Sequence, residues 1–404
     1  MSSRSPSRHA VTFVFITVFL DMVGFGLVMP VLPRLIEAVS GADLADASLL
    51  AGWLIFAYGG MQFLCEPVLG NLSDAYGRRP ILLLSVFGFA VDYLLTAFAP
   101  NMLWLFVGRT FAGLCGASYT TANAYLADIT KPEERAKVFG YMGAAFGLGF
   151  IIGPAIGGIL GEYGPRVPFF VAAGVSILNF AYGFFVLPET VPREMRRPFC
   201  LARSNPIGVF KVFSTYKQVL PLCIIMAMYF FATSVYPAIW AFWGIARFDW
   251  SESTIGLTLA IFGLITAIVQ GGLTGPTVKW LGERNTALLA FTSSVIAAAG
   301  YGLASGLPMV LILFIIHAPE GFAQPALTAL MSKDAPPDAQ GELQGGIASA
   351  QNLALLVGTV MFAQIFGYFL QDGSPIQSPN VGYFIAAALC LLTLLIFARL
   401  PRHN

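Results

Sequence analysis

AVTFVFITVFLDMVGFGLVMPVLP, residues 10–33, is a run of 24 residues with one ionisable side chain, Asp21. A bilayer core about 30 Å thick is crossed by roughly 20 apolar residues in an α-helix. A cleaved signal peptide is the alternative, because the basic segment MSSRSPSRHA precedes the run. The run is too long for that, carries Asp21 in its middle and lacks a clean small-residue cleavage site, so it predicts a transmembrane helix.

Runs of the same kind recur along the chain. Of its 404 residues 57% are hydrophobic and 11% are charged, and the mean hydropathy is +0.76, which lies outside the usual range of soluble domains. Short breaks of Gly, Pro or charged residues separate the runs. We predict an all-α membrane protein with twelve transmembrane helices, at residues 10–33, 47–69, 80–99, 101–127, 136–160, 167–188, 217–243, 253–275, 285–304, 308–331, 342–370 and 380–399.

The charges between the runs predict the orientation. The segments before, between and after the spans alternate between the two sides of the membrane, and both termini fall on the same side. The segments on that side contain 18 of the 22 Lys and Arg residues. The segments on the opposite side contain only Arg34, Arg166 and Arg247, and Arg109 lies within a run. Because positive charge is retained on the cytoplasmic side, we expect a multi-pass protein of the cytoplasmic (inner) membrane with both termini in the cytoplasm.

A shift of 205 residues brings helix-breaking and charged residues of the two halves into coincidence. Six coincidences at one offset favour two similar halves of six helices each. We predict an N-terminal bundle at 1–188, a cytoplasmic linker at 189–216, whose four arginines can hold anionic headgroups, and a C-terminal bundle at 217–404. The pairs are Gly70 and Gly275, Gly77 and Gly282, Arg79 and Arg284, Pro132 and Pro337, Gly140 and Gly345, and Gly153 and Gly358.

No sequence pattern indicates a cofactor, a metal or nucleic acid. The cysteines have no metal-ligand spacing and are expected to be free thiols. The sequence contains no phosphate-binding loop, no nucleophile, base and orienter set, and no basic patch with interleaved aromatics. We therefore expect neither a cofactor nor an enzymatic activity. The cysteines are Cys65, Cys115, Cys200, Cys223 and Cys390.

The segment GNLSDAYGRRP, Gly70–Pro80, forms the predicted cytoplasmic turn between the second and third spans. Its glycines permit backbone conformations that other residues resist, its aspartate can cap a helix or pair with a cation, and its arginines can face anionic lipid. An ordinary charged loop is the alternative. The residues that we assign to a cytoplasmic gate are Glu66, Gly70, Asp74, Gly77, Arg78 and Arg79.

A second motif, GFIIGPAIGG, occupies residues 149–158 within the fifth span. Its small residues allow close helix contact, and its proline releases a backbone carbonyl and bends the helix. Helix packing without a further role is the alternative. The motif residues are Gly149, Gly153, Pro154, Gly157 and Gly158.

At these motifs the chain resembles the major facilitator superfamily. GNLSDAYGRRP resembles its loop signature, LFVGRTFAG its fourth-helix signature, and GFIIGPAIGG the fifth-helix signature of exporters that exchange substrate for protons. FLDMVGFGLVMPVLP, SDAYGRRPILLLSVFGFAVDYLLTAF and FGLGFIIGPAIGGILGEYGPRVPFF look like the tetracycline efflux branch of the twelve-helix drug:proton antiporters, and weaker similarity continues through RFDWSESTIGLTLAIFGL to the end. The resemblance implies two helical bundles that rock around a central cavity.

The chain departs from this branch in its second half. Tetracycline pumps carry a histidine on helix eight and an aspartate on helix nine for proton coupling, and the resemblance places Thr266 and Val295 there. Asp21 and Asp92 match the first-half acids of the pumps. The substrate therefore stays open, and tetracycline itself is not assigned.

The segment FIIHAPEGFAQP, residues 314–325, places two ionisable side chains inside an apolar span. His317 and Glu320 share a helical face with Gln324, and two prolines loosen the backbone around them. The tetracycline pumps have small or apolar residues on this helix. We therefore hypothesise that the second-half protonatable function has moved here; a local pair that only steadies a kinked helix is the alternative.

A charged side chain within a membrane span costs about 2.5–3.5 kcal/mol on insertion scales, so such residues are seldom without function. Four potential anions face one permanent cation and one histidine, so at least two carboxyl groups must be protonated or reach water. The acids on spans one and ten lie near mid-membrane and lead the assignment. A structural pair with another helix is the alternative for Asp92. Arg109 is expected to balance Asp21 or to lie near the proton path, and a structural role is its alternative. The proton-coupling candidates are Asp21, Glu320, His317, Asp92 and Arg109.

Span seven carries an aromatic stripe at steps of four and three residues. Packing or lipid contact is the alternative to a ligand site, and Trp243 near the outer boundary also fits an interfacial aromatic belt. A cavity lined by the stripe and by amides has few fixed charges and suits a mostly apolar organic molecule, cationic ones included. The cavity candidates are Tyr58, Gln62, Tyr229, Thr233, Tyr236, Trp240, Gln324, Gln351 and Asn352.

We predict a proton-driven exporter of small amphipathic organic compounds that works by alternating access. Its expected partners are a small organic substrate, protons and membrane lipid, not nucleic acid, and a monomer is expected. One rival is an importer that takes up a metabolite or siderophore with protons, against which GFIIGPAIGG argues. The other is a non-transporting membrane receptor or a membrane-embedded enzyme.

Overall fold

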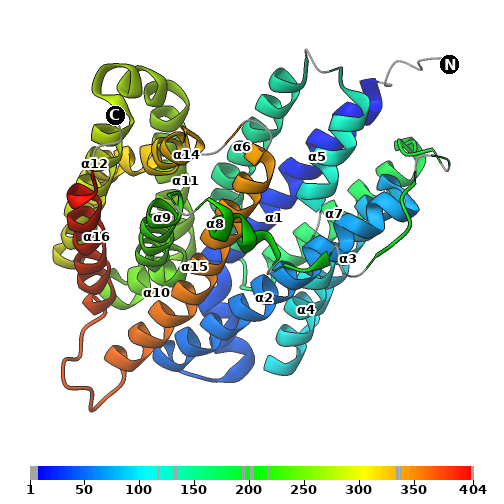
Figure 1. Ribbon diagram of the computed structural model, residues 1–404. Helices are drawn as coiled ribbons and strands as arrows, with labels where there is room; N and C mark the ends of the chain where they lie inside the picture. Colours follow the sequence, from blue (N-terminus) through cyan, green and yellow to red (C-terminus); the bar gives the residue numbers. More distant parts are fainter. Residues whose placement is uncertain are drawn as a thin grey trace. The chain divides into compact units, whose positions relative to one another are not determined.

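The computed structural model describes residues 8–116, 118–131, 134–192, 194, 196–200, 204–206, 208–216, 218–333, 336 and 339–401. Within these ranges the chain is helical and contains no β-strand (Figure 1), so the predicted all-α class is confirmed. Arg193 and Arg203 of the linker, and Pro132 and Pro337 of the internal repeat, lie outside the described residues.

The helices follow one another with short connections. The elements of the first half are α1 (Arg8–Ser40), α2 (Leu44–Tyr76), α3 (Arg78–Phe98), α4 (Met102–Cys115), α5 (Ser118–Ile129), α6 (Arg135–Gly161) and α7 (Val167–Val186). Those of the second half are the 3₁₀-helix η4 (Gly208–Phe210), α8 (Lys211–Thr215), α9 (Leu220–Thr233), α10 (Val235–Phe248), α11 (Glu252–Ile268), the π-helix η5 (Val269–Leu273), α12 (Thr274–Leu303), α13 (Leu307–His317), the 3₁₀-helix η6 (Ala318–Phe322), α14 (Ala323–Lys333), α15 (Gln340–Leu370) and α16 (Val381–Arg399).

The chain divides into two compact units, and each includes a short piece of the other half of the sequence. The start of α2 belongs to unit 2, and the start of α11 belongs to unit 1. The predicted bundle limits, with a linker at 189–216, stay a prediction. Unit 1 comprises Met1–Gly41, Leu54–Pro206 and Trp250–Ala260; unit 2 comprises Ala42–Trp53, Ile207–Asp249 and Ile261–Asn404.

Among the described residues, ten helical stretches are long and apolar enough to cross a membrane. Nine of the twelve predicted spans each correspond to one of them. The predicted spans 253–275 and 285–304 form a single stretch, Glu252–Leu303, which turns at Gly282. The predicted span 101–127 is divided into α4 and α5, which are only 14 and 12 residues long.

α6 packs along α1 through a face of small residues (Figure 1). A side chain at any of three glycines one helical turn apart would overlap a backbone carbonyl oxygen of α1. The contacts are Gly149 with Phe19, Gly153 with Val23 and Gly157 with Leu27. Beside this face, Gly158 meets the backbone of Glu252 in the first turn of α11. The motif GFIIGPAIGG thus permits close helix packing, as small residues do elsewhere; a role in transport stays a prediction.

The internal repeat is visible in the geometry of paired residues. Gly77 and Gly282 both lie in the left-handed region, with φ values of 110° and 77°, and each marks the turn before a long helix. Arg79 donates to a carbonyl oxygen near the end of α7, and Arg284 donates to carbonyl oxygens at the end of α16. Residues 205 positions apart therefore do the same structural work in the two halves.

Prolines break two spans of unit 2 from within. Pro237 has no N–H for the carbonyl of Thr233, and the chain passes there from α9 to α10. Pro319 interrupts the membrane-spanning stretch Leu307–Lys333 in the same way, so that α13 ends and the 3₁₀ turn η6 begins. The predicted loosening around His317 is confirmed. η6 contacts the π-helix η5, and the two irregular turns therefore adjoin.

Candidate functional site

Asp92 on α3 and Arg109 on α4 form a buried ion pair in unit 1. The Asp92 side chain is 1% exposed, and Arg109 Nη2 contacts Asp92 Oδ2 directly. Gly108 gives the carboxylate its room, because a Cβ atom there would lie 2.8 Å from Asp92 Oδ1. Thr96 Oγ1 donates to the same oxygen at 3.4 Å. Arg109, which is expected from the sequence to balance Asp21 or to lie near the proton path, forms its ion pair with Asp92.

Two tyrosines connect this pair to Asp21. The guanidinium carbon of Arg109 lies 5.9 Å from the centre of the Tyr58 ring on α2. Tyr93 on α3 places its hydroxyl against Gly24, one turn beyond Asp21 on α1. Asp21 and Arg109 are both within electrostatic range of the two phenol groups. Tyr93 is not among the predicted residues, because only the tertiary packing carries it to α1.

The other predicted polar residues of α2 contact the α4–α5 region. Gln62 Nε2 donates to the carbonyl oxygen of Gly116 at 3.0 Å and so satisfies an open carbonyl at the end of α4. The Thr120 side chain on α5 lies within interaction range of the Glu66 carboxylate. Both side chains therefore tie α2 to its neighbours, and their assignment to a cavity or a gate stays a prediction.

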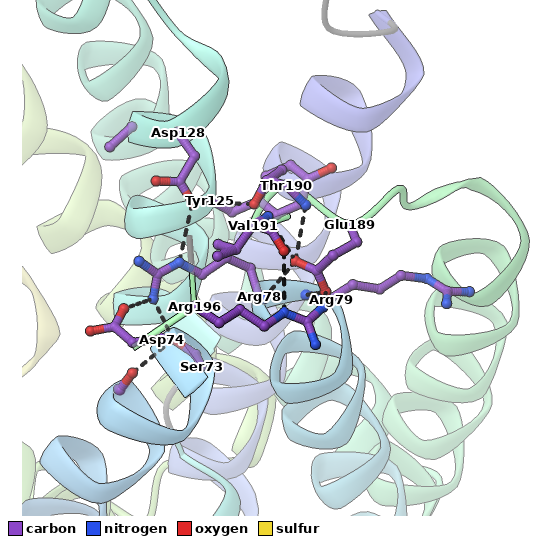
Figure 2. Close-up of polar contacts among 12 residues, drawn as sticks. Ser73, Asp74, Arg78, Arg79, Tyr125, Asp128, Glu189, Thr190, Val191 and Arg196 are labelled. Carbon is purple, nitrogen blue, oxygen red and sulfur yellow. Dashed lines mark hydrogen bonds and ion pairs between the residues drawn. The ribbon is translucent and has the colours of Figure 1, made fainter. Parts of the chain in front are cut away.

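The motif GNLSDAYGRRP, predicted to face the cytoplasm, forms an ion-pair network (Figure 2). Arg78 pairs with Asp74 at 2.5 Å and with Asp128 on α5 at 3.2 Å, and it donates to Ser73 Oγ at 2.6 Å. The expectation that Arg78 faces lipid is wrong, because its side chain is 15% exposed and engaged in these contacts. The expectation of an unusual backbone at Gly70 is also wrong, since this residue lies inside α2.

A residue outside the motif completes it. Gly77 precedes α3 with a φ of 110° and has no side chain with which to cap the helix. Glu189, which follows α7, accepts hydrogen bonds at this point from the backbone N–H groups of Arg78 at 2.9 Å and Arg79 at 3.3 Å (Figure 2). Its carboxylate lies 4.0 Å from Arg196. A carboxylate suits the positive end of the helix dipole. Sequence reasoning missed Glu189 because its partner Arg78 is 111 residues away in the chain.

The described part of the linker is attached to the same end of α2. Asn71 Nδ2 donates to the carbonyl oxygen of Cys200 at 2.6 Å and to Ser204 Oγ at 3.1 Å. The backbone N–H of Arg197 donates to the carbonyl oxygen of Asp74 at 3.3 Å. The motif GNLSDAYGRRP therefore holds both the start of α3 and the chain that leaves α7.

Replacing Glu189 by alanine is expected to loosen the first turn of α3. Loss of a helix-capping side chain costs about 0.5–2 kcal/mol, or roughly tenfold in local opening. Hydrogen–deuterium exchange of the purified protein in lipid nanodiscs should show faster exchange at the amides of Arg78 and Arg79. Glu194→Ala, an exposed glutamate of the linker, is the matched control and should leave these amides unchanged. Equal exchange in both variants would contradict the capping role.

His317 and Glu320 form the corresponding pair of unit 2. His317 Nε2 lies 2.5 Å from Glu320 Oε2, and the two side chains are 1% and 20% exposed. The other ring nitrogen, Nδ1, lies 3.3 Å from Tyr301 Oη on α12. Phe262 of α11 stacks on the imidazole ring, with a centroid distance of 4.9 Å and an interplanar angle of 24°. The structure therefore brings the two predicted residues together and adds Tyr301, which the sequence does not single out.

Gln324 does not join this pair. Its Nε2 donates to Gln351 Oε1 on α15 at 3.4 Å, because a 3₁₀ turn of three residues per turn changes the angular position of the residues that follow. Gln351 is buried, whereas Asn352 is exposed. Thr233 bonds only within its own helix among the interactions described, through the carbonyl oxygen of Phe230 at 3.4 Å. These amides and the threonine stay candidates for a cavity.

Thr266 and Val295 lie on α11 and α12 of unit 2. The Thr266 side chain is close to η6, because a Cβ atom at Gly321 would lie 3.7 Å from Thr266 Cγ2. The residue that stands in place of the helix-eight histidine of the tetracycline pumps is therefore next to the turn that carries Glu320. This proximity agrees with the hypothesis that the protonatable function has moved to η6.

The aromatic stripe of span seven is largely buried within unit 2. Tyr229, Trp240 and Trp243 are 3%, 5% and 0% exposed. The interfacial-belt reading of Trp243 is wrong, since its Nε1 donates to Asn380 Oδ1 at 2.8 Å. Tyr236 lies against His317, with ring centroids 4.5 Å apart. The stripe thus builds the aromatic wall around the His317–Glu320 pair, and a contact with substrate stays a prediction.

Comparisons with known proteins agree with this architecture. A sequence profile of the family described as Major Facilitator Superfamily matches residues 14–359. The chain is 37% identical over 388 residues to the class C tetracycline resistance protein of Escherichia coli, with 96% of each chain covered. It is 35% identical over 367 residues to the class H tetracycline resistance protein of Pasteurella multocida, with 90% of each covered. Among solved structures, a human organic anion transporter matches with a TM-score of 0.70 at 23% identity, over 97% of this chain and 99% of that one.

Proposed function

Because the chain is a member of the major facilitator superfamily, we propose that it exports small amphipathic organic compounds, tetracycline-like drugs among them, across the cytoplasmic membrane in exchange for protons. The relatives named above are tetracycline resistance proteins. Transport, and not an enzymatic reaction, is the activity proposed. The distribution of lysine and arginine supports a cytoplasmic position for both termini.

One observation carries the proton coupling: the 2.5 Å contact of His317 Nε2 with Glu320 Oε2 inside a membrane-spanning segment. The pair of unit 1 contains Arg109, whose charge is permanent. The pair of unit 2 has a histidine in that place, so its net charge changes when one proton binds. Both members of the unit 2 pair are therefore titratable, whereas in unit 1 only Asp92 is, beside a permanent cation that favours its ionised form.

Alternating access is the mechanism that we propose for this pair. Glu320 keeps 20% of its side chain exposed, whereas His317 is buried. The carboxylate can therefore reach water while it stays in contact with the buried imidazole. Proton uptake neutralises the carboxylate, and its release restores a site for an approaching cationic or polar group of the substrate. Bundles at 1–188 and 217–404, joined by a linker at 189–216, are the proposed moving parts.

Transport direction is the feature that tests the proposal. In inside-out membrane vesicles energised by respiration, tetracycline and ethidium serve as probes. One proton falling through 100 mV supplies about 2.3 kcal/mol, enough for roughly fifty-fold accumulation. We expect energy-dependent accumulation of at least one probe, lost on addition of a protonophore and absent from vesicles without the protein.

The rival functions predict different results when inside-out and right-side-out vesicles are compared. A proton-coupled importer of a metabolite or siderophore would accumulate its substrate only in right-side-out vesicles. A receptor would bind a probe without any flux that depends on the proton gradient. Either result would overturn the proposed export.

A further inference from the structure

Three tyrosines from three helices pack around His317 in unit 2. Tyr236 of α10 and Tyr301 of α12 have ring centroids 4.5 Å and 5.6 Å from the imidazole. Tyr383 of α16 lies 6.0 Å from Tyr236 and 5.7 Å from Tyr301 between ring centroids. Tyr301 and Tyr383 are 1% and 0% exposed. The imidazole therefore borders a buried cluster of three phenol groups.

Only one of the three hydroxyl groups has a protein partner in the described part of the chain. Tyr301 Oη lies 3.3 Å from His317 Nδ1, whereas the hydroxyl oxygens of Tyr236 and Tyr383 are buried and make no hydrogen bond. A buried hydroxyl without a partner destabilises a fold, and phenylalanine would fill the same space. Two such hydroxyls beside a titratable pair therefore require a functional explanation.

When the His317–Glu320 pair has not gained a proton, Tyr301 must act as a hydrogen-bond donor to His317. An ionised Glu320 carboxylate can only accept, so the neutral ring of His317 donates its hydrogen from Nε2. Nδ1 then carries a lone pair and accepts the O–H of Tyr301. In this state the hydroxyls of Tyr236 and Tyr383 are not needed.

When the pair gains one proton, Tyr301 changes from donor to acceptor, whether the proton resides on His317 or on Glu320. If His317 becomes an imidazolium, Nδ1 carries a hydrogen. If Glu320 Oε2 takes the proton and donates it to Nε2, the neutral ring must carry its hydrogen on Nδ1. In both cases Tyr301 Oη becomes the acceptor, and its own hydrogen must turn to another oxygen. The hydroxyls of Tyr236 and Tyr383, whose ring centroids lie 5.8 Å and 5.7 Å from that of Tyr301, have unused lone pairs and accept this hydrogen once a side-chain rotation brings the oxygens together.

We propose that Tyr301 is a positioning residue that senses the protonation of the His317–Glu320 pair, by donating to Nδ1 in the unprotonated state and donating to Tyr236 or Tyr383 in the protonated state. The inference rests on the proposed coupling role of the pair. No covalent bond changes beyond the proton gained from water. The two acceptors favour the protonated state, and they connect it to α10 and α16.

Other titratable groups also face the pair. Glu320 is within electrostatic range of Tyr229 on α9, Tyr236 on α10, Tyr301 on α12 and Cys390 on α16. From α11 the ring of Phe262, which cannot titrate, covers His317. The experiment below follows the ring nitrogens of His317 and therefore reports on the His317–Glu320 pair itself.

The test follows His317 directly. The chain has three histidines, and His9→Gln with His403→Gln leaves His317 as the only one for ¹⁵N-histidine NMR in lipid nanodiscs. At high pH we expect a hydrogen on Nε2 and a bare Nδ1, and at low pH a hydrogen on Nδ1. Tyr236→Phe with Tyr383→Phe should lower the titration midpoint by about half to one pH unit, the worth of one buried hydrogen bond.

Tyr301 decides the outcome. In the Tyr301→Phe background the same two substitutions should produce no additional shift in the titration midpoint. Without the Tyr301 hydroxyl, the protonation of His317 is no longer passed on to Tyr236 and Tyr383, the connection that we call the relay. Thr359→Val is the matched control, since this hydroxyl bonds to its own helix at Leu355. An unchanged midpoint in the Tyr236→Phe, Tyr383→Phe variant would overturn the relay, and so would an equal shift with and without Tyr301. The coupling role of the pair is tested separately by Glu320→Gln. Loss of driven transport in this variant would support the coupling role even if the relay fails, and intact driven transport would overturn the coupling role itself.

Discussion

Replacing Glu320 by glutamine is expected to abolish accumulation driven by a proton gradient while sparing exchange of substrate for substrate. Glutamine has nearly the same shape and can still accept a hydrogen bond from His317 Nε2, so the turn η6 keeps its packing. It cannot gain or lose a proton in the accessible pH range. Substrate can therefore still cross as the protein alternates between its states, but no proton energy is transmitted to it.

The measurement uses purified protein in liposomes with tetracycline or ethidium as the probe. With an imposed proton gradient, the variant should lose the accumulation of up to roughly fifty-fold that one proton per 100 mV supports. Counterflow, in which labelled probe exchanges for unlabelled probe, should stay within about twofold of the parent, because it requires no net proton movement. Glu342→Gln, at an exposed glutamate in the first turn of α15, is the control. Unchanged driven accumulation in Glu320→Gln would remove Glu320 from the coupling mechanism.

Replacing Arg109 by methionine is expected to destabilise unit 1 strongly. The Asp92 side chain is 1% exposed and Arg109 is its charged partner, so the variant leaves a buried carboxylate unpaired. Breaking a buried ion pair from one side typically costs about 3–5 kcal/mol. We expect a lower yield of folded protein and a transition several degrees lower, followed with a thiol-reactive dye that reports exposure of the buried Cys115 on α4.

A second substitution distinguishes charge from shape. Asp92→Asn in the Arg109→Met background removes the unpaired charge and should recover most of the lost stability. Arg247→Met, at an exposed arginine near the end of α10, controls for the loss of one positive charge. If Arg109→Met alone unfolds at the temperature of the parent protein, the ion pair contributes nothing to stability. If the double variant recovers stability but not driven transport, the pair also has a role in the transport cycle.

The candidate site could be predicted from the sequence only where its parts are close along the chain. His317 and Glu320 are three residues apart, and a helix or a 3₁₀ turn brings such residues together regardless of the remaining structure. Asp74 and Arg78 are also only four residues apart, but their ion pair is not itself predicted, because Asp74 is expected to cap a helix or to pair with a cation and Arg78 to face lipid. Local reasoning cannot find Tyr301 or Glu189, because Tyr301 belongs to a different helix from His317 and Glu189 lies beyond the end of α7.

The sequence by itself determined that this protein is a helical membrane protein, and it predicted two similar halves. Those conclusions depend on how many apolar residues are needed to cross a bilayer and on glycines such as Gly77 and Gly282, whose backbone conformations are local properties. Only the tertiary structure decided which charges neutralise one another. From the sequence Arg109 is expected to balance Asp21, and in the structure it pairs with Asp92, because Gly108 allows α3 and α4 to approach closely. Electrostatic energy depends on distances between atoms, and helix packing sets those distances.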